Sequence, residues 1–309
     1  MRLVVASMFV ASVSVVAVVF AQSGQATKSG ETAPKPKLLG KHLARGQAKN
    51  DAGSYGGDLP LQYHGGEIVK FTTEVHPIFW GPKWNDSTFV QDKNAGLALF
   101  YAGASSHYLS TNTEYTDSTT VHTSDLLVEP GPSYLDASTV TAAPTDASAV
   151  LAEVCKAVGS AVKVHAYYPV YVDKPRGTNG FCAWHSSGFC GNTKVDFAFF
   201  FNLDGDGGCD PHDLVSGHSQ GLSALANVSG HELSERQTDP DGSAWFAADG
   251  YENSDKCAWT FGQNLLTFSN GTVWKVQGNW SNAARSAGQG YVDHTYFGKQ
   301  FVGCVDGTN

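Results

Sequence analysis

The chain has 309 residues, of which 41% are hydrophobic and 16% are charged, and its formal net charge is −9 at pH 7. This acidic balance argues against nucleic acid or an anionic membrane surface as a partner. The chain is long enough to bury a sizeable core, and about 250 residues beyond position 57 suit one domain better than two.

The N-terminus has the pattern of an export signal. Met1 and Arg2 precede an apolar run, Leu3–Phe20, and the small residue Ala21 suits cleavage, which predicts a signal peptide over residues 1–21. An uncleaved membrane anchor is the alternative. Residues 22–57 are rich in Gly, Ser, Lys and Pro, which predicts a flexible segment, either a tether or a pro-segment. We expect one domain over residues 58–309.

All six cysteines follow this signal, and six is an even number. We therefore expect three disulfides and a secreted protein, extracellular or periplasmic. Fifteen pairings are open to six cysteines. Among them we favour Cys182 with Cys190, which would close a short loop, and Cys257 with Cys304, which would tie back the C-terminal end.

Hydrophobic periodicity predicts alternating strands and helices. Residues Glu67–Trp80 read as a strand, Thr88–Leu109 as a helix, and Thr145 and Asp146 cap a further helix. The later predicted elements are strands at Lys163–Val172 and Val195–Leu203, a helix at Gln220–Thr238, and short strands near Leu265–Phe268 and Val273–Val276. This order predicts an α+β fold: a zincin-like mixed sheet packed with helices, with a loop-rich, disulfide-bonded C-terminal part.

The helix at Gln220–Thr238 carries a motif close to that of zinc proteases. In SGHELSERQTDP, His231 and Glu235 are four residues apart, so both could reach one metal ion. Glu232 lies about 100° further round the helix, where it could take a proton from an attacking water. A zinc protease has a second histidine where this chain has Glu235. The alternative is an ordinary helix in which Glu232 or Glu235 pairs with Arg236.

A third ligand would come from the acidic residues downstream. The candidates are Asp239, Asp241, Glu252 and Asp255. An anionic ligand at Glu235 weakens the Lewis acid and widens the choice of metal. Zinc is the cofactor that we expect, with calcium as a second candidate.

Two further stretches could carry chemistry. Gly217–Gly221 (GHSQG) fits the GxSxG elbow of serine hydrolases, but a polar loop precedes it instead of a strand, so we interpret Ser219 as a helix cap and keep a nucleophile as the alternative. Phe181–Cys190 (FCAWHSSGFC) places His185 in an expected disulfide loop, where it could contact a substrate or a metal, or simply be exposed.

The loop NLDGDGGCDPHD resembles the calcium loop of an EF-hand. Its oxygen side chains are Asn202, Asp204, Asp206, Asp210 and Asp213. The first and last positions depart from that pattern, since Asn stands for Asp and Asp for the bidentate Glu. A polar turn held by a disulfide of Cys209 is an equal alternative.

Five stretches in order resemble one family of secreted proteins. They are LQYHGG (Leu61–Gly66), IFWG (Ile78–Gly81), FCAWH (Phe181–His185), GHELSE followed by TDP and Trp245, and ENSDKCAW (Glu252–Trp259). Together they resemble the Exordium or phosphate-induced proteins, and the microbial members more closely than the plant ones. The resemblance implies a secreted or cell-surface protein, tied in plants to growth and cell-wall responses, with no settled activity. The family's helix motif falls on His231, Glu232 and Glu235, and its acidic tail on Asp239, Glu252 and Asp255.

The sequence thus leads to a ranked set of hypotheses. The first is a secreted metal-dependent hydrolase of metallopeptidase type, with Glu232 as general base, His185 as a second catalytic candidate, and His231, Glu235 and Glu252 or a neighbouring aspartate as ligands. The second is a non-catalytic extracellular signalling or wall-associated protein with a structural cation. A serine hydrolase is a distant third. We expect a monomer whose partner is an extracellular protein or a cell-wall component, without membrane contact after signal cleavage.

Overall fold

The computed structural model describes residues 35–47, 59–105, 107–128, 133–263, 265–291, 294–296 and 299–307. Pro34–Asn309 form one compact unit. The predicted signal peptide lies outside the described residues. Within the described ranges, no helix combines the length and the apolar character that crossing a membrane requires.

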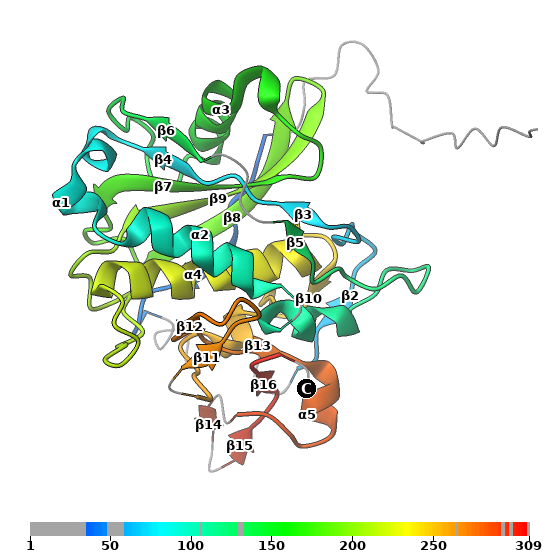
Figure 1. Ribbon diagram of the computed structural model, residues 1–309. Coiled ribbons are helices and arrows are strands. Elements are labelled where there is room, and N and C mark those ends of the chain that lie inside the picture. The colour runs from blue at the N-terminus through cyan, green and yellow to red at the C-terminus, as the bar shows by residue number, and fades with distance from the viewer. Residues whose placement is uncertain are drawn as a thin grey trace, which may run out of the picture. The chain divides into compact units, whose positions relative to one another are not determined.

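A six-stranded mixed sheet is the centre of the fold (Figure 1). Its strands, in spatial order, are β1 (Leu39–Leu43), β8 (Phe181–Cys190), β9 (Thr193–Asn202), β7 (Tyr167–Pro175), β4 (Ile78–Trp80) and β6 (Tyr134–Asp136). The last four are parallel to one another, whereas β8 and β1 are added as antiparallel strands at one side. The prediction of an α+β fold with a mixed sheet is confirmed.

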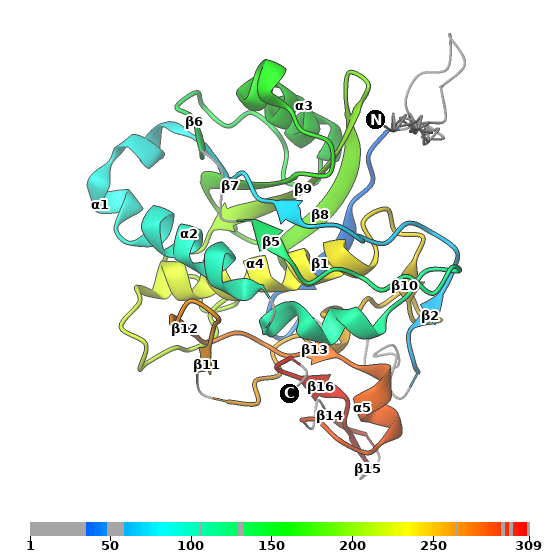
Figure 2. The same cartoon turned by 45° about the vertical axis from the view of Figure 1, so that its right-hand side comes forward.

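Helices cover both faces of this sheet because its central strands are apolar on both sides. In β9 every residue from Val195 to Phe201 is buried. Helix α3 (Ala147–Val158) packs on one face, and α4 (Gln220–Thr238) with α2 (Lys93–Ala104) packs on the other (Figures 1 and 2). The cap predicted for α3 is present, since the Asp146 carboxylate accepts a hydrogen bond from Ala149 N.

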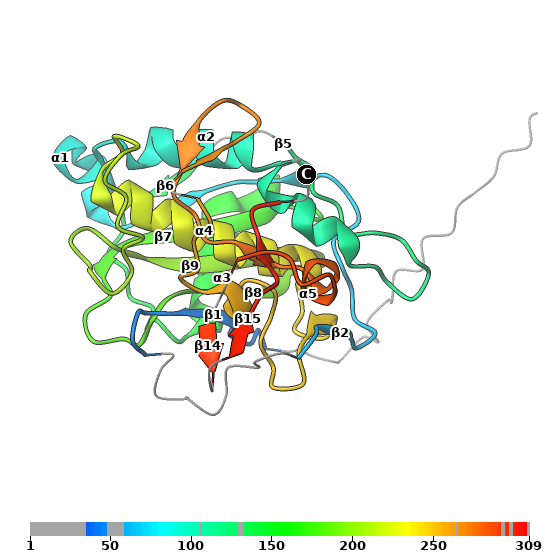
Figure 3. The same ribbon diagram turned by 90° about the horizontal axis from the view of Figure 1, so that it is seen from below.

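Helix α4 is buried from Gly221 to Thr238, although its second half is polar. It follows Ser219, whose hydroxyl accepts a hydrogen bond from Leu222 N, and it spans Gln220–Thr238, as the sequence predicts. Seen from below, the C-terminal segments lie across α4 on the side away from the sheet (Figure 3). Because both sides of α4 are covered, every polar side chain of its second half needs a partner inside the protein.

The remaining elements are short. They are η2 (Pro82–Asn85), α1 (Ser87–Val90), η3 (Tyr108–Glu114), η4 (Gly159–Ala161), η5 (Asp255–Cys257), α5 (Asn282–Ser286), and the strand pairs β10–β2 (Trp245–Phe246, Gln62–Tyr63), β3–β5 (Thr73–Glu74, Leu127–Val128), β11–β12 (Leu266–Thr267, Val273–Trp274), β13–β16 (Asn279–Trp280, Cys304–Val305) and β14–β15 (His294–Tyr296, Lys299–Phe301). In place of the one strand predicted at 67–80, the structure has two short strands, β3 and β4. The predicted helix at 88–109 is interrupted at Gln91, which has a φ of +48°.

The predicted disulfide loop around His185 is instead the long strand β8. Cys182 and Cys190 lie at its two ends, about 27 Å apart along an extended chain, so they cannot pair. The bonds are Cys155–Cys190, which ties α3 to β8, and Cys182–Cys209, which ties β8 to the acidic loop. The predicted bond Cys257–Cys304 is present.

The predicted flexible segment 22–57 also contains a strand. Leu39–Leu43 forms β1, paired with the outer edge of β8, and His42 within it is fully buried. The composition of the segment hides this strand because its few apolar residues are concentrated at Leu38, Leu39 and Leu43. The remaining parts of the segment, 22–34 and 48–57, lie outside the described residues.

A buried ion pair joins α4 to the sheet. Arg236 is fully buried, and its Nε donates to Asp196 Oδ2 on β9 over 2.8 Å. We expect Asp196→Ala to lower the free energy of unfolding by about 3–5 kcal/mol, because it leaves a buried charge without its partner. Lys70→Ala, which removes an exposed pair with Asp117, is the control and should cost about 1 kcal/mol or less. Equal costs in urea unfolding would contradict this role for Arg236.

Candidate metal centre

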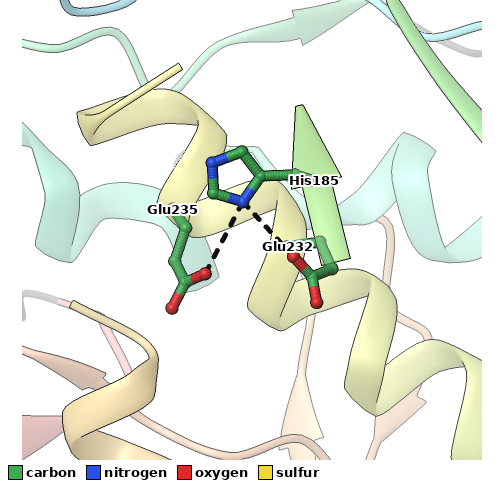
Figure 4. Close-up of side chains that lie close together, drawn as sticks. All are labelled: His185, Glu232 and Glu235. Carbon is green, nitrogen blue, oxygen red and sulfur yellow. Dashed lines mark hydrogen bonds and ion pairs between the residues drawn. The ribbon is translucent and has the colours of Figure 1, made fainter. Parts of the chain in front are cut away.

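The strand β8 and the helix α4 bring one imidazole and two carboxylates together (Figure 4). Successive side chains of β8 point to opposite faces, so Trp184 lies on one face, where its indole donates to Pro144 O, and His185 meets α4 on the other. His185 Nδ1 lies 3.3 Å from Glu232 Oε2 and 3.6 Å from Glu235 Oε2. One metal ion could take a ligand atom from each of the three.

A second set of groups shares Glu235. His231 Nε2 lies 3.0 Å from Glu235 Oε1 and 3.5 Å from Asp255 Oδ1. Glu235 belongs to both sets because it follows His231 by four residues and Glu232 by three, and both spacings place side chains next to each other on a helix. These are the two groups within the described residues that could hold an ion.

The centre is closed to solvent and contains polar atoms without partners. His185, His231, Glu232 and Glu235 are all fully buried. Among the described residues of the centre, the atoms without a hydrogen-bond partner are Glu235 Oε2, Glu252 Oε2, Asp239 Oδ2 and His231 Nε2. Buried polar atoms without a partner are costly, and a cation is one means of satisfying them. The donor set, imidazole nitrogen with carboxylate oxygens, suits zinc and also manganese.

The hydrogen bonds of His185 direct the lone pair of Nδ1 towards Glu232, whose Oε2 lies 3.3 Å away. His185 Nε2 lies 3.3 Å from the carbonyl oxygen of Asp239. A carbonyl oxygen only accepts hydrogen bonds, so Nε2 carries the proton and Nδ1 presents its lone pair to the two carboxylates. A metal-binding histidine is commonly held in this way by a carbonyl group on its other nitrogen. Burial also lowers the pKa of His185 to about 3, so the ring is neutral.

His231 is held in the opposite way. The amide nitrogen of Gln277 lies 3.0 Å from His231 Nδ1, and it also donates to Ser254 O over 2.8 Å. The amide oxygen of Gln277 accepts from Trp259 N, which fixes the orientation of the amide. His231 Nδ1 must therefore accept, and the proton lies on Nε2, which faces Glu235 and Asp255.

Burial and neighbouring charges shift the pKa of His231 in opposite directions. Burial alone would lower its pKa, but the charges of Glu235 and Glu232 and a hydrogen bond with Asp255 raise it well above the usual value. A doubly protonated ring, however, would place an Nδ1 proton against the amide protons of Gln277. A neutral ring with its proton on Nε2 avoids this clash and places the N–H beside Glu235 Oε1, 3.0 Å away. His185, Glu232 and Glu235 therefore fit a cation better than the set containing His231.

The carboxylates of the centre resist ionisation in this environment. Burial raises the pKa of Glu235 to about 7, with a further contribution from the charge of Asp255. Burial also raises the pKa of Glu232 and of Glu252 well above the usual value. A bound cation would lower the pKa values of these carboxyl groups and keep them charged.

The other predicted ligands lie at different distances from the centre. Glu252 Oε2 is 3.8 Å from His185 Nε2, and Asp255 N donates to Glu235 Oε1 over 2.9 Å, so both adjoin it. Asp239 ends α4 and uses one carboxylate oxygen to accept from Ser243 N and Ala244 N. Asp241 pairs with Lys194 instead and takes no part.

A surface hollow of about 230 Å³ reaches the edge of the centre. Its walls are β1, the turn 249–251 and Asp255. The Asp255 side chain is 12% exposed, whereas those of His231 and Glu235 are fully buried. Asp255 is thus the carboxylate through which the centre adjoins solvent.

The loop predicted to bind calcium uses its carboxylates elsewhere. Asp204 pairs with Lys93, Asp206 makes two contacts with Arg176, and Asp213 accepts from Val215 N and Ser216 N. Asn202 Oδ1 accepts from Asp204 N, and Asp210 Oδ1 from His212 N. Within the described residues, no three of these carboxylates converge on one point. The disulfide that holds Cys209 is present, and calcium binding by the loop stays a prediction.

Ser219 is the N-cap of α4, as predicted. Its hydroxyl donates to Asp92 Oδ1 and accepts from Leu222 N, at 2.5 and 3.1 Å. The neighbouring His218 stacks on Trp274. The hydroxyl therefore has two structural partners, and neither is a histidine that could activate it as a nucleophile.

Three residues that contact the centre lie outside the helix motif, which does not predict them. His42 of β1 stacks on His231 with ring centroids 4.1 Å apart, and its backbone N donates to Glu232 Oε1 over 3.4 Å. Gly40 of β1 lies against Glu235 and His185. Gln277 holds His231 from the C-terminal part. An unexplained histidine in an apolar stretch, LLGKHL, is the one clue that the sequence offers.

No family model, curated protein or solved structure matches the chain. The resemblance to the Exordium family therefore stays a prediction.

The buried carboxylates predict an unusual pH dependence for protein treated with a chelator. Between about pH 5 and 7 the carboxylates of the unfolded chain are ionised, whereas the pKa of about 7 keeps a proton on Glu235 in the folded chain, and burial raises the pKa values of Glu232 and Glu252 in the same direction. The folded state then holds more protons, so stability falls as pH rises, by roughly 1–3 kcal/mol over this range. Urea unfolding at several pH values measures this, and added zinc should reverse it. A chelated protein with constant stability would contradict the account.

Proposed function

We propose that the protein is an exported metal-dependent hydrolase of metallopeptidase type. The observation that carries this proposal is the lone pair of His185 Nδ1, which faces Glu232 and Glu235 inside a closed cluster of carboxylates. Three disulfides fit an oxidising environment outside the cytosol. The resemblance to a family of secreted proteins agrees with export but adds no activity.

The residues take the following roles in this proposal. His185, Glu232 and Glu235 hold a divalent cation, which when bound supplies Lewis acidity and makes water a better nucleophile. The Asp239 carbonyl and the Gln277 amide fix the protonation of the two histidines. Asp255 lines the hollow and is the carboxylate best placed to accept a proton from water that enters there. Glu232 thereby changes from the general base of the sequence-based hypothesis to a ligand.

A second candidate function is a non-catalytic extracellular protein with a structural cation. The complete burial of the four central side chains favours this alternative, because no substrate reaches them in the arrangement described. The two functions share the cation and differ in turnover, so metal binding and hydrolysis need separate tests.

The first test compares the two histidines. We expect one divalent cation per chain in the parent and in His231→Gln, and an affinity at least about 100-fold weaker in His185→Gln. The reason is that His185 Nδ1 presents its lone pair to the two carboxylates, whereas the lone pair of His231 is taken by the Gln277 amide. Elemental mass spectrometry after reconstitution with zinc or manganese measures the content, and circular dichroism checks that each variant is folded. Loss of the cation in His231→Gln but not in His185→Gln would assign the metal site to His231. No cation in the parent would end the metal hypothesis.

The second test concerns the proton acceptor. Asp255→Asn should keep the cation and lose hydrolysis of a peptide substrate by about 10²–10⁴-fold, since the amide cannot accept a proton from water. Asp249→Asn is the matched control, because Asp249 lines the same hollow without adjoining the cluster. Equal activities in these two variants would remove Asp255 from the mechanism.

A further inference from the structure

Two residues of β1, the first described strand of the chain, lie against the candidate metal centre. A methyl group added to Gly40 would lie 1.9 Å from Glu235 Oε2 and 2.7 Å from His185 Nδ1. His42 follows two residues later, stacks on His231 and donates its backbone N–H to Glu232. Two positions of β1 thus contact the four central side chains.

The strand adapts its shape to lie over the centre. Leu39 pairs with His185 and His42 with Ala183, so β1 has one residue more than β8 in this interval. This β-bulge contains Gly40, which has a φ of +37°. Glycine is required here for two reasons. It adopts this positive φ without strain, and it has no side chain that would collide with the centre. Bulges of this kind are common beside active sites.

Backbone hydrogen bonds and side-chain contacts together hold the segment. Among the side chains, Arg45 Nε donates to Asp210 O over 2.9 Å, and the His42 ring packs on Trp259 as well as on His231. Besides the pairing with β8, five hydrogen bonds join backbone atoms of residues 37–45 to the rest of the protein: Lys37 O with Ser186 Oγ, His42 N with Glu232, Leu43 O with Trp259 Nε1, Ala44 N with Gly180 O, and Arg45 N with Gly208 O. Arg45 adds a side-chain contact over the ring of Trp259. Backbone pairing with a sheet edge is the means by which many proteins bind extended peptides.

The strand β1 lies at the edge of the sheet, where a separate peptide could also pair. It is the end strand of the sheet, and without it the outer edge of β8 would present unpaired N–H and C=O groups beside His185. The surface hollow opens between β1 and the turn 249–251. The edge of β8 that receives β1 therefore runs past the candidate catalytic groups.

We propose that residues 35–47 occupy the peptide-binding edge of the enzyme and hold it in a latent state. The inference rests on the proposed function. The substrates are extended peptides that pair with β8 and place a glycine where Gly40 lies. Release of β1 opens the centre, so the segment acts as an internal competitor of the substrate. The sequence leaves open whether the N-terminal segment is a tether or a pro-segment. The inference assigns it the role of keeping the enzyme latent.

The test uses the full chain with the recognition sequence of a site-specific protease inserted directly after Gln47. Cleavage should let residues 35–47 dissociate on gel filtration. A labelled peptide of that sequence, KPKLLGKHLARGQ, should bind the opened protein in fluorescence polarisation. A peptide with valine for the glycine, KPKLLVKHLARGQ, should bind at least about tenfold more weakly, because its side chain meets Glu235 and His185. Hydrolysis of glycine-containing peptides with zinc present should rise about tenfold or more on cleavage.

A pair of variants in the uncut chain supplies a second measurement. Gly40→Ala and Gly46→Ala both place a side chain at a positive φ, +37° and +82°. Only the first meets the metal centre, since nothing lies within 4 Å at Gly46. Gly40→Ala should therefore raise hydrolysis in the uncut chain by displacing β1, whereas Gly46→Ala should not.

The outcomes separate this inference from the proposed function. If the cut segment stays bound, or if its removal unfolds the protein by circular dichroism, β1 is an integral strand and the inference fails. If hydrolysis appears on cleavage but neither peptide binds, the inference fails and the hydrolase stands. If the glycine peptide binds selectively and no hydrolysis follows with zinc bound, the peptide-binding edge stands and the hydrolase fails.

Discussion

The structure depends on three buried carboxylates and a fourth at the edge of solvent, gathered around two buried histidines. Glu232, Glu235 and Glu252 are buried and Asp255 is nearly so, while His185 and His231 are neutral in the hydrogen-bond network described. A cluster of this kind needs protons or a cation to remain folded at neutral pH, because isolated buried charges are very costly. Each surrounding element contributes a part of this arrangement. The strand β8 carries His185, the helix α4 carries two glutamates, and the C-terminal part supplies Gln277 and Asp255.

The rest of the fold holds α4 and β8 in place with strong restraints. Arg236 fastens α4 to β9 from within the core, and disulfides anchor both ends of β8. Rigid support matters at a metal centre because ligands must keep their geometry whether or not the ion is bound. The strand β1 differs from these elements, since it adds to an outer edge and neither a disulfide nor a buried ion pair holds it among the described residues.

Periodicity in the sequence was a sound guide to the core and to α4. The run VDFAFFF predicts β9, and Ser219, the apolar spacing and Thr238 fix both ends of α4 closely. The roles of the two histidines could not be predicted, since they depend on Gln277 and on the Asp239 carbonyl. Helix spacing places His231 beside Glu235 but says nothing about which nitrogen is protonated. His185 was a weak candidate because its cysteine-flanked stretch resembles a loop, whereas tertiary pairing makes it a strand. The contact of Gly40 with the centre comes from long-range pairing that no local pattern encodes.

The ligand assignment is the central claim, and crystallographic anomalous scattering tests it most directly. Crystals of the protein reconstituted with zinc would be measured on both sides of the zinc absorption edge. The account predicts one anomalous peak at binding distance from His185 Nδ1 and from the carboxylates of Glu232 and Glu235. A peak beside His231 Nε2, or no peak within the cluster, would contradict it.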